Sequence, residues 1–95
     1  MIDEKLFWDA SEMEALIILQ EECAEAIVDI SKCFRFGPDQ IMSGQELSNI
    51  QRLEKELGDL QAMVELLTDL NVGVGALTKD QLEQILKDIK SKKLH

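Results

Sequence analysis

The chain is poor in the residues that bind metals through nitrogen or sulfur. Its 95 residues include one histidine and two cysteines, and the histidine, His95, is the last residue. We do not expect His95 to bind a metal. Cys23 and Cys33 lie ten residues apart, which matches no zinc-binding pattern, and they are expected to be buried free thiols rather than a disulfide. A metal site in this chain would therefore depend on oxygen ligands.

Long hydrophobic runs are also absent. No uninterrupted apolar segment approaches the roughly 20 residues that a membrane span requires, so no membrane contact is expected. The first residues, Met1 to Lys5, have neither the basic nor the apolar region of a signal peptide, which predicts a cytoplasmic protein. At 95 residues we expect one domain over 1–95, small enough that a homo-oligomer would supply extra burial.

Positive charge is scarce. The sequence has 10 basic and 19 acidic residues, which gives a formal charge of −9. This charge repels a phosphate backbone, so direct binding of nucleic acid is not expected. Most of the acidic residues are typical of solvated helix surfaces.

The helical period is the only periodicity that persists along the chain, which predicts an all-α fold. We expect a small bundle of about four helices built around an antiparallel two-helix hairpin. A short first helix is predicted over 3–8. The second is expected to begin at Ser11, where Glu14 completes a capping box, and to end before the single proline, Pro38.

Two further helices follow. The third is expected to begin at Ser43, where Glu46 completes a second capping box, and to end at Asn71. Its apolar residues follow the three-four spacing of a bundle helix: Ile50, Leu53, Leu57, Leu60, Val64 and Leu67. The fourth is expected to begin at Thr78, whose capping box includes Gln81.

Two carboxylate pairs with a spacing of three lie on the second and third predicted helices. Glu22 and Glu25 project from one helix face, and Glu56 and Asp59 project from the other. At ~1.5 Å per residue, Glu25 lies about 16 Å from the end of its helix and Glu56 about 20 Å from the start of its own. A tight hairpin therefore places Glu25 opposite Glu56, and Glu22 opposite Asp59.

Four converging carboxylates repel one another and must bind protons or cations. Oxygen ligands without histidine or cysteine favour Mg²⁺ or Mn²⁺. Gly58 lies between Glu56 and Asp59, where glycine costs about 1 kcal/mol relative to alanine, and this indicates close approach of another helix or a ligand. The alternative interpretation is that all four are ordinary exposed acids on helix surfaces.

Both half-motifs resemble a known family. The stretch Glu21-Glu22-Cys23-Ala24-Glu25 is similar to the EExxE motif, and Glu56-Leu57-Gly58-Asp59 to the ExxD motif, of the MazG-type all-α nucleoside triphosphate pyrophosphohydrolases. The resemblance covers about residues 12–70. The stretch Cys33-Phe34-Arg35-Phe36-Gly37 is similar to the loop region of short, single-domain members, some of them viral.

This resemblance implies Mg²⁺-dependent hydrolysis of a (deoxy)nucleoside triphosphate to the monophosphate and pyrophosphate by a homodimer or homotetramer. It implies that the metal ligands are Glu22, Glu25, Glu56 and Asp59. We further predict that Glu21 or Glu25 accepts the proton of the attacking water.

Three other residues are predicted to contact the nucleotide. Lys32 and Arg35, near the end of the hairpin, are candidates for phosphate contacts, and Trp8 for stacking on the base, although solvated cations and a core aromatic are the plainer interpretations. Two other functions stay open at this point. One is a phosphoribosyl-ATP pyrophosphatase, and the other is a non-enzymatic helical module whose acidic face binds a basic partner.

Overall fold

The computed structural model describes residues 7–93. Within this range the fold has three helices and no β-strand: α1 (Ala10–Phe36), α2 (Asn49–Asp69) and α3 (Lys79–Lys93). The all-α prediction is confirmed. The predicted first helix falls largely on residues outside the described range, and its last two residues, Phe7 and Trp8, lie in a bend.

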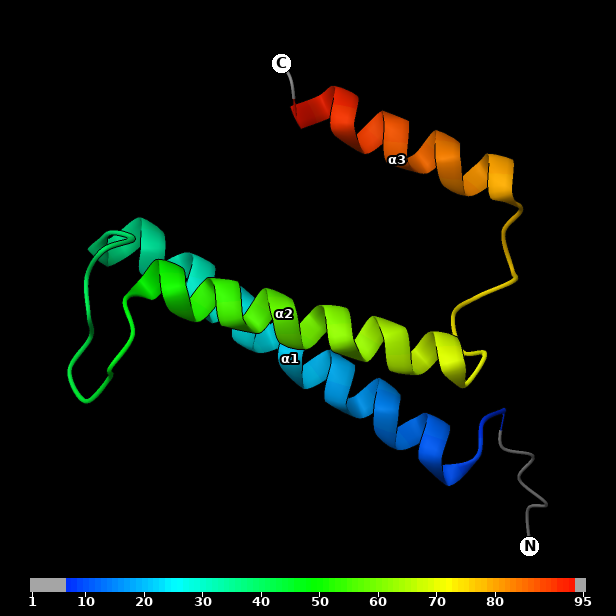
Figure 1. Cartoon of the computed structure of the whole chain (residues 1–95), viewed down its shortest axis with the longest axis horizontal. Coiled ribbons are helices and arrows are strands. Elements are labelled where there is room, and N and C mark those ends of the chain that lie inside the picture. The colour runs from blue at the N-terminus through cyan, green and yellow to red at the C-terminus, as the bar shows by residue number, and fades with distance from the viewer. Residues whose placement is uncertain (1–6, 94–95) are drawn as a thin grey trace, which may run out of the picture.

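Helices α1 and α2 form an antiparallel hairpin, and α3 stands apart from it (Figure 1). Among the described helices, only α1 and α2 pack against each other. A single chain thus supplies a packed pair of helices and one unpacked helix over the described residues. The predicted four-helix bundle is not formed by this part of the chain.

Both ends of α1 have clear chemical causes. At its start, Asp9 Oδ1 accepts a hydrogen bond from Glu12 N at 2.8 Å, and Glu12 Oε1 accepts one from Asp9 N at 2.9 Å. The predicted start at Ser11 is wrong by two residues, because an earlier capping box is present and Ser11 continues the helix. At the other end, Gly37 has a φ of 96°, and the next residue is Pro38, as predicted.

The start of α2 differs more from the prediction. Its N-cap is Ser48, whose Oγ accepts from Gln51 N at 3.3 Å while Gln51 Oε1 accepts from Ser48 N at 2.9 Å. Ser43 and Glu46 belong instead to the loop that joins the helices, in which Ile41 and Ser48 form an isolated β-bridge. Both serines have a glutamate or glutamine three residues later, so the capping pattern alone does not choose between them.

Asn49 explains why α2 begins where it does. Its side chain is the most buried in the described chain, at 1% exposure. The Asn49 Nδ2 group donates to Gly37 O at 3.0 Å, and the Asn49 backbone N–H donates to Gln40 O at 2.9 Å. These bonds join the start of α2 to the end of α1 and so fix the level at which the two helices face each other.

Burial within the hairpin divides into an apolar end and a polar end. The small apolar cluster consists of Ala15, Leu67 and Val72, near the start of α1 and the end of α2. Toward the connecting loop the buried residues other than Ala26 are polar: Asp29, Ser48, Asn49 and Glu56. The helix pair therefore has space for chemistry in its polar half.

Several smaller predictions are also settled. Thr78 and Gln81 form the expected capping box at the start of α3, with Gln81 N donating to Thr78 Oγ1 at 3.1 Å. Both cysteines are free thiols, but Cys23 is exposed rather than buried and Cys33 is half-buried. None of the helices over residues 7–93 is both long enough and apolar enough to cross a membrane.

Candidate metal centre

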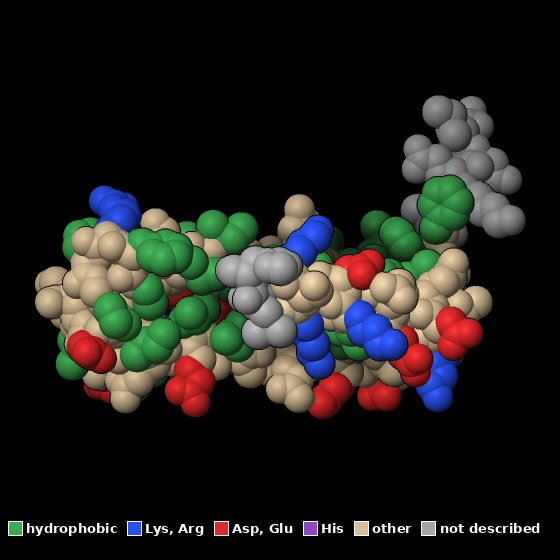
Figure 2. Space-filling view, turned by 90° about the horizontal axis from the view of Figure 1, so that it is seen from above, with side chains coloured by type: hydrophobic (Ala, Val, Ile, Leu, Met, Phe, Trp, Pro, Cys, Tyr) green, Lys and Arg blue, Asp and Glu red, His purple; other side chains and the backbone are tan. Residues whose placement is uncertain are grey.

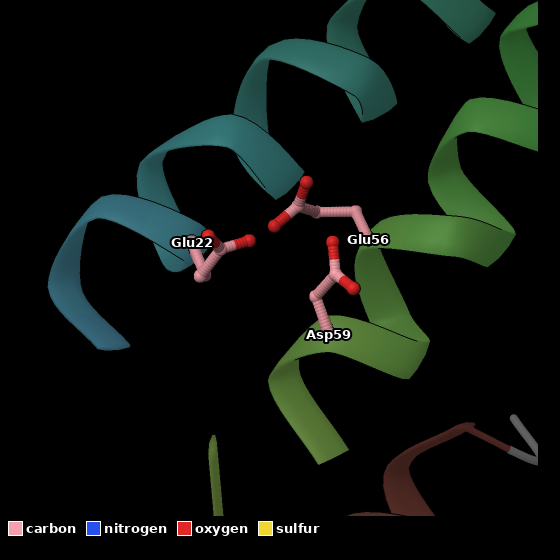
Figure 3. A group of neighbouring side chains, drawn as sticks. All are labelled: Glu22, Glu56 and Asp59. Atoms are coloured by element: carbon pink, nitrogen blue, oxygen red, sulfur yellow. The ribbon is translucent and has the colours of Figure 1, made fainter. Parts of the chain in front are cut away.

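Three carboxylates from the two packed helices meet in the polar half of the hairpin. Glu22 extends from α1, and Glu56 and Asp59 extend from α2 (Figure 3). One carboxylate oxygen from each residue lies within 4.8 Å of the corresponding oxygens of the other two. We call these three residues the acid trio. A single cation could contact all three oxygens.

Burial makes this arrangement costly for the free carboxylates. Glu56 is 5% exposed, and Glu22 is half-buried. Glu22 Oε2 and Glu56 Oε1 are both buried without a hydrogen-bond partner among the described residues. A buried carboxylate oxygen without a donor or counter-ion is destabilising, so these two atoms indicate a missing proton or cation.

The protonation of Glu56 follows from the same surroundings. Burial, the largest cause, and the adjacent carboxyl groups of Glu22 and Glu25 together raise the pKa of Glu56 from 4.5 to about 8. The protonated form can donate a hydrogen bond to either neighbour, whereas the ionised form adds a third negative charge. Below about pH 8 a proton thus occupies the position that a cation would take.

Asp59 has a positive neighbour in the metal-free protein. Lys55 Nζ lies 3.1 Å from Asp59 Oδ2, one helical turn away on α2. This hydrogen bond to Asp59 raises the pKa of the Lys55 ammonium group. The pair is largely solvated, and such pairs contribute little to stability, so Lys55 can leave Asp59 at small cost when a cation binds.

A cleft of about 350 Å³ opens beside the acid trio. Its lining residues come from both packed helices: Ala24, Glu25, Val28, Asp29, Arg52 and Glu56. A smaller hollow of about 140 Å³ shares most of these residues and adds Leu47 and Lys55. Because Glu56 belongs to the trio and also lines the cleft, a molecule in the cleft would lie next to the trio.

Three charged residues among those that line the cleft and the hollow were not predicted from the sequence. Asp29 is buried at 5% exposure, and its Oδ1 lies 3.7 Å from Arg52 Nε. Lys55 is the third. A signal for them exists, since Asp29 follows Glu25 by four residues and Arg52 precedes Glu56 by four, which places each on the acidic face of its own helix.

Glu21 and Glu25, the two predicted catalytic residues, occupy different positions relative to the cleft. Glu25 was also predicted as the fourth metal ligand. Glu25 is exposed, lines the cleft and lies beside Glu56, but it is not part of the acid trio. Glu21 is exposed and does not line the cleft. Of these two carboxylates, Glu25 is therefore the one adjacent to both the trio and the cleft.

The predicted nucleotide-binding residues are not brought to the cleft. Lys32 and Arg35 lie in the last turns of α1, and the Arg35 guanidinium lies 5.0 Å from the centre of the Phe36 ring. Trp8 precedes α1 and packs edge-on against Phe7 at 6.4 Å between ring centres. None of the three lines the cleft or the smaller hollow.

The close approach of another helix that was expected at Gly58 is not found among the described residues. A side chain added at this position would meet no heavy atom within 4 Å. No other helix among the described residues approaches Gly58 this closely.

Comparison with known proteins adds no relative. No family model matches the chain. Neither a curated protein nor a solved structure matches it. The acid trio, the cleft and the two sequence motifs are therefore the features from which a function can be inferred.

Proposed function

We propose that this chain is a cytoplasmic, Mg²⁺-dependent nucleotide pyrophosphohydrolase that converts (deoxy)nucleoside triphosphates to the monophosphate and pyrophosphate. The observation that carries the proposal is the acid trio, in which two helices bring together three carboxylates and leave two of their oxygens buried without a donor. The two motifs that resemble the MazG-type enzymes contribute all three of these residues.

The donor set suits a hard divalent cation. All three ligands of the trio are carboxylates, and Mg²⁺ and Mn²⁺ prefer oxygen donors and retain sites for water and substrate phosphates. Glu22, Glu56 and Asp59 would hold the ion, with Glu25 beside them as the fourth acid. When bound, Mg²⁺ would neutralise charge on the phosphate oxygens and lower the pKa of a coordinated water.

Glu25 is suited to accept the proton of the attacking water. It lines the cleft beside Glu56 yet is exposed, so its carboxylate keeps contact with solvent while the trio is occupied. A general base must reach the water within hydrogen-bond distance, and Glu25 meets this condition better than Glu21, which lies outside the cleft.

A panel of nucleoside triphosphates tests the proposed activity. We expect the protein to release equal amounts of monophosphate and pyrophosphate from at least one of them when Mg²⁺ is present, and no product when a chelator replaces the metal. Phosphoribosyl-ATP belongs in the panel, and turnover of that compound alone would support the related pyrophosphatase instead. Absence of turnover on every compound would contradict the proposal and favour the acidic interaction module.

The proposed enzyme is also a homo-oligomer, either a dimer or a tetramer. Only four apolar residues are buried over the described range: Ala15, Ala26, Leu67 and Val72. Meanwhile Ile50, Leu57 and Val64, spaced seven residues apart on α2, are 44%, 53% and 55% exposed. Figure 2 shows further hydrophobic side chains gathered at the end of the molecule where α1 ends and α2 begins. A second copy would cover such surfaces.

Substitution within this α2 stripe is expected to dissociate the oligomer. Val64→Glu places a charge where a partner helix would pack, so the mass measured by sedimentation should fall to that of a monomer. Ala62→Glu adds the same charge on another side of the same helix and should leave the mass unchanged. A wild-type protein that sediments as a monomer at all concentrations would contradict the oligomer.

A further inference from the structure

We infer that the cleft beside the acid trio binds a metal-complexed polyphosphate chain, with the Arg52 guanidinium as its anchor. The inference rests on the proposed function for the source of that chain, a nucleoside triphosphate. It assigns to Arg52 the role that the sequence suggested for Lys32 and Arg35, neither of which reaches the cleft.

Arg52 is held in place but not saturated. Its Nη1 group donates to Gln45 Oε1 from the connecting loop. Its Nε group faces Asp29 Oδ1 at 3.7 Å, too far for a hydrogen bond, and this buried Nε has no acceptor among the described residues. A guanidinium has five N–H donors in a fixed fork, so Arg52 keeps donors for phosphate oxygens.

Among the described residues that line the 350 Å³ cleft, no other group can replace the Arg52 guanidinium as a donor to phosphate. Among residues 7–93, Arg52 is the only cationic residue that lines the 350 Å³ cleft, and Lys55 lines only the smaller hollow. The first backbone N–H groups of α2 are already used, since Asn49 N donates to Gln40 O and Ile50 N donates to Pro38 O, each at 2.9 Å. An anion in this cleft must therefore be recognised by the guanidinium.

The acids of the cleft determine the form of the ligand. Glu25, Asp29 and Glu56 line it together with Arg52, so a free phosphate would meet more negative than positive charge. A phosphate chain that carries a divalent cation avoids this repulsion, because the acid trio binds the cation. Arg52 lies about 6 Å along the helix axis from Glu56 and about 10 Å from Asp59. A chain of several phosphates can span this separation, with one phosphate on the cation and another on the guanidinium.

Calorimetric titration with inorganic tripolyphosphate tests this inference without turnover. The wild-type chain should bind tripolyphosphate in the presence of Mg²⁺ and should not bind it in the presence of a chelator. Arg52→Gln should weaken binding roughly 10- to 100-fold, and Arg52→Lys should recover only part of the loss because lysine lacks the fork. Lys87→Gln removes an exposed cation of α3 and should bind as the wild type does.

A second variant guards against misfolding, because Arg52→Gln leaves Asp29 buried without its cation. The Asp29→Asn/Arg52→Gln double variant removes both charges and should show the same loss of tripolyphosphate binding while still binding Mn²⁺ alone. Binding at wild-type strength in both variants would overturn the inference, even in a protein that hydrolyses nucleotides. A wild type that fails to bind Mg²⁺-tripolyphosphate would overturn it too. Arg52-dependent binding without any nucleotide turnover would support this site and contradict the proposed function.

Discussion

Glu56→Gln is expected to abolish pyrophosphate release and, at the same time, to stabilise the metal-free protein at alkaline pH. The loss should be at least roughly 100-fold in kcat, because the side chain no longer supplies the charged oxygen at the centre of the acid trio. The gain in stability has a separate cause. Glu56 is 5% exposed, its pKa is about 8, and its Oε1 has no donor. The amide of glutamine is uncharged and can donate to Glu22 and Glu25.

Two measurements on the same preparations separate these effects. Pyrophosphate release with Mg²⁺ reports the site, and urea unfolding with a chelator reports the fold. Glu54→Gln removes an exposed acid from the same helix and should change neither. If Glu56→Gln hydrolyses nucleotides at the wild-type rate, Glu56 is not a metal ligand. If it unfolds more easily than the wild type above about pH 8, the energetic account of the buried carboxylate is wrong.

The sequence predicts which acidic residues of α1 and α2 face each other more accurately than it predicts where α2 begins. The start of α2 is Ser48 rather than Ser43, which moves Glu56 from about 20 Å to about 12 Å from the start of its helix. Glu56 nevertheless meets α1 near Glu22 and Glu25, because the other helix ends at Phe36 as expected and Asn49 fixes the start of α2 against that end. Such a tertiary hydrogen bond is not visible in a capping pattern.

The predicted phosphate-binding residues lie away from the cleft for a different reason. Lys32 and Arg35 lie near the hairpin loop in the sequence, whereas the cleft is formed by residues that share a face with the acids. Arg52 precedes Glu56 by one helical turn and satisfies that criterion. Helical periodicity predicts which residues of one helix point the same way, and it predicts cleft residues only when it is applied to the cations as well as to the acids.

Helix α3 shows that helical periodicity does not identify the partner against which an apolar face packs. The sequence assigns α3 an apolar face, and the four residues of that face are all exposed in the structure: Leu82, Ile85, Leu86 and Ile89. An amphipathic pattern predicts that a helix buries one side, but it does not specify whether the partner is the same chain or another copy. The pattern therefore predicts a helical bundle but does not specify whether one chain or several chains form it.

The stability of the metal-free protein should fall as the pH rises from about 5 to about 9, and Mg²⁺ should remove most of that fall. The folded-state pKa of Glu56, about 8, lies above the ordinary value of 4.5. Between these two values the native state holds more protons than the unfolded state, so the free energy of unfolding decreases with pH. The stabilisation is fully present below pH 4.5 and is lost as the pH passes through about 8. The shift corresponds to a loss of about 3–5 kcal/mol.

Mg²⁺ and the proton compete for the carboxylate of Glu56. This competition determines how the stabilisation by Mg²⁺ depends on pH. Metal binding requires ionised Glu56, so the stabilisation by Mg²⁺ should grow with pH until about pH 8 and then level off. Urea unfolding curves at several pH values, with Mg²⁺ or with a chelator, measure both effects, and Glu56→Gln should show neither. Equal unfolding midpoints with and without Mg²⁺ above about pH 8 would mean that the acid trio binds no cation, because Glu56 is then ionised and no proton competes with the metal for it. A fall in stability that persists in Glu56→Gln would assign the pH dependence to a group other than Glu56.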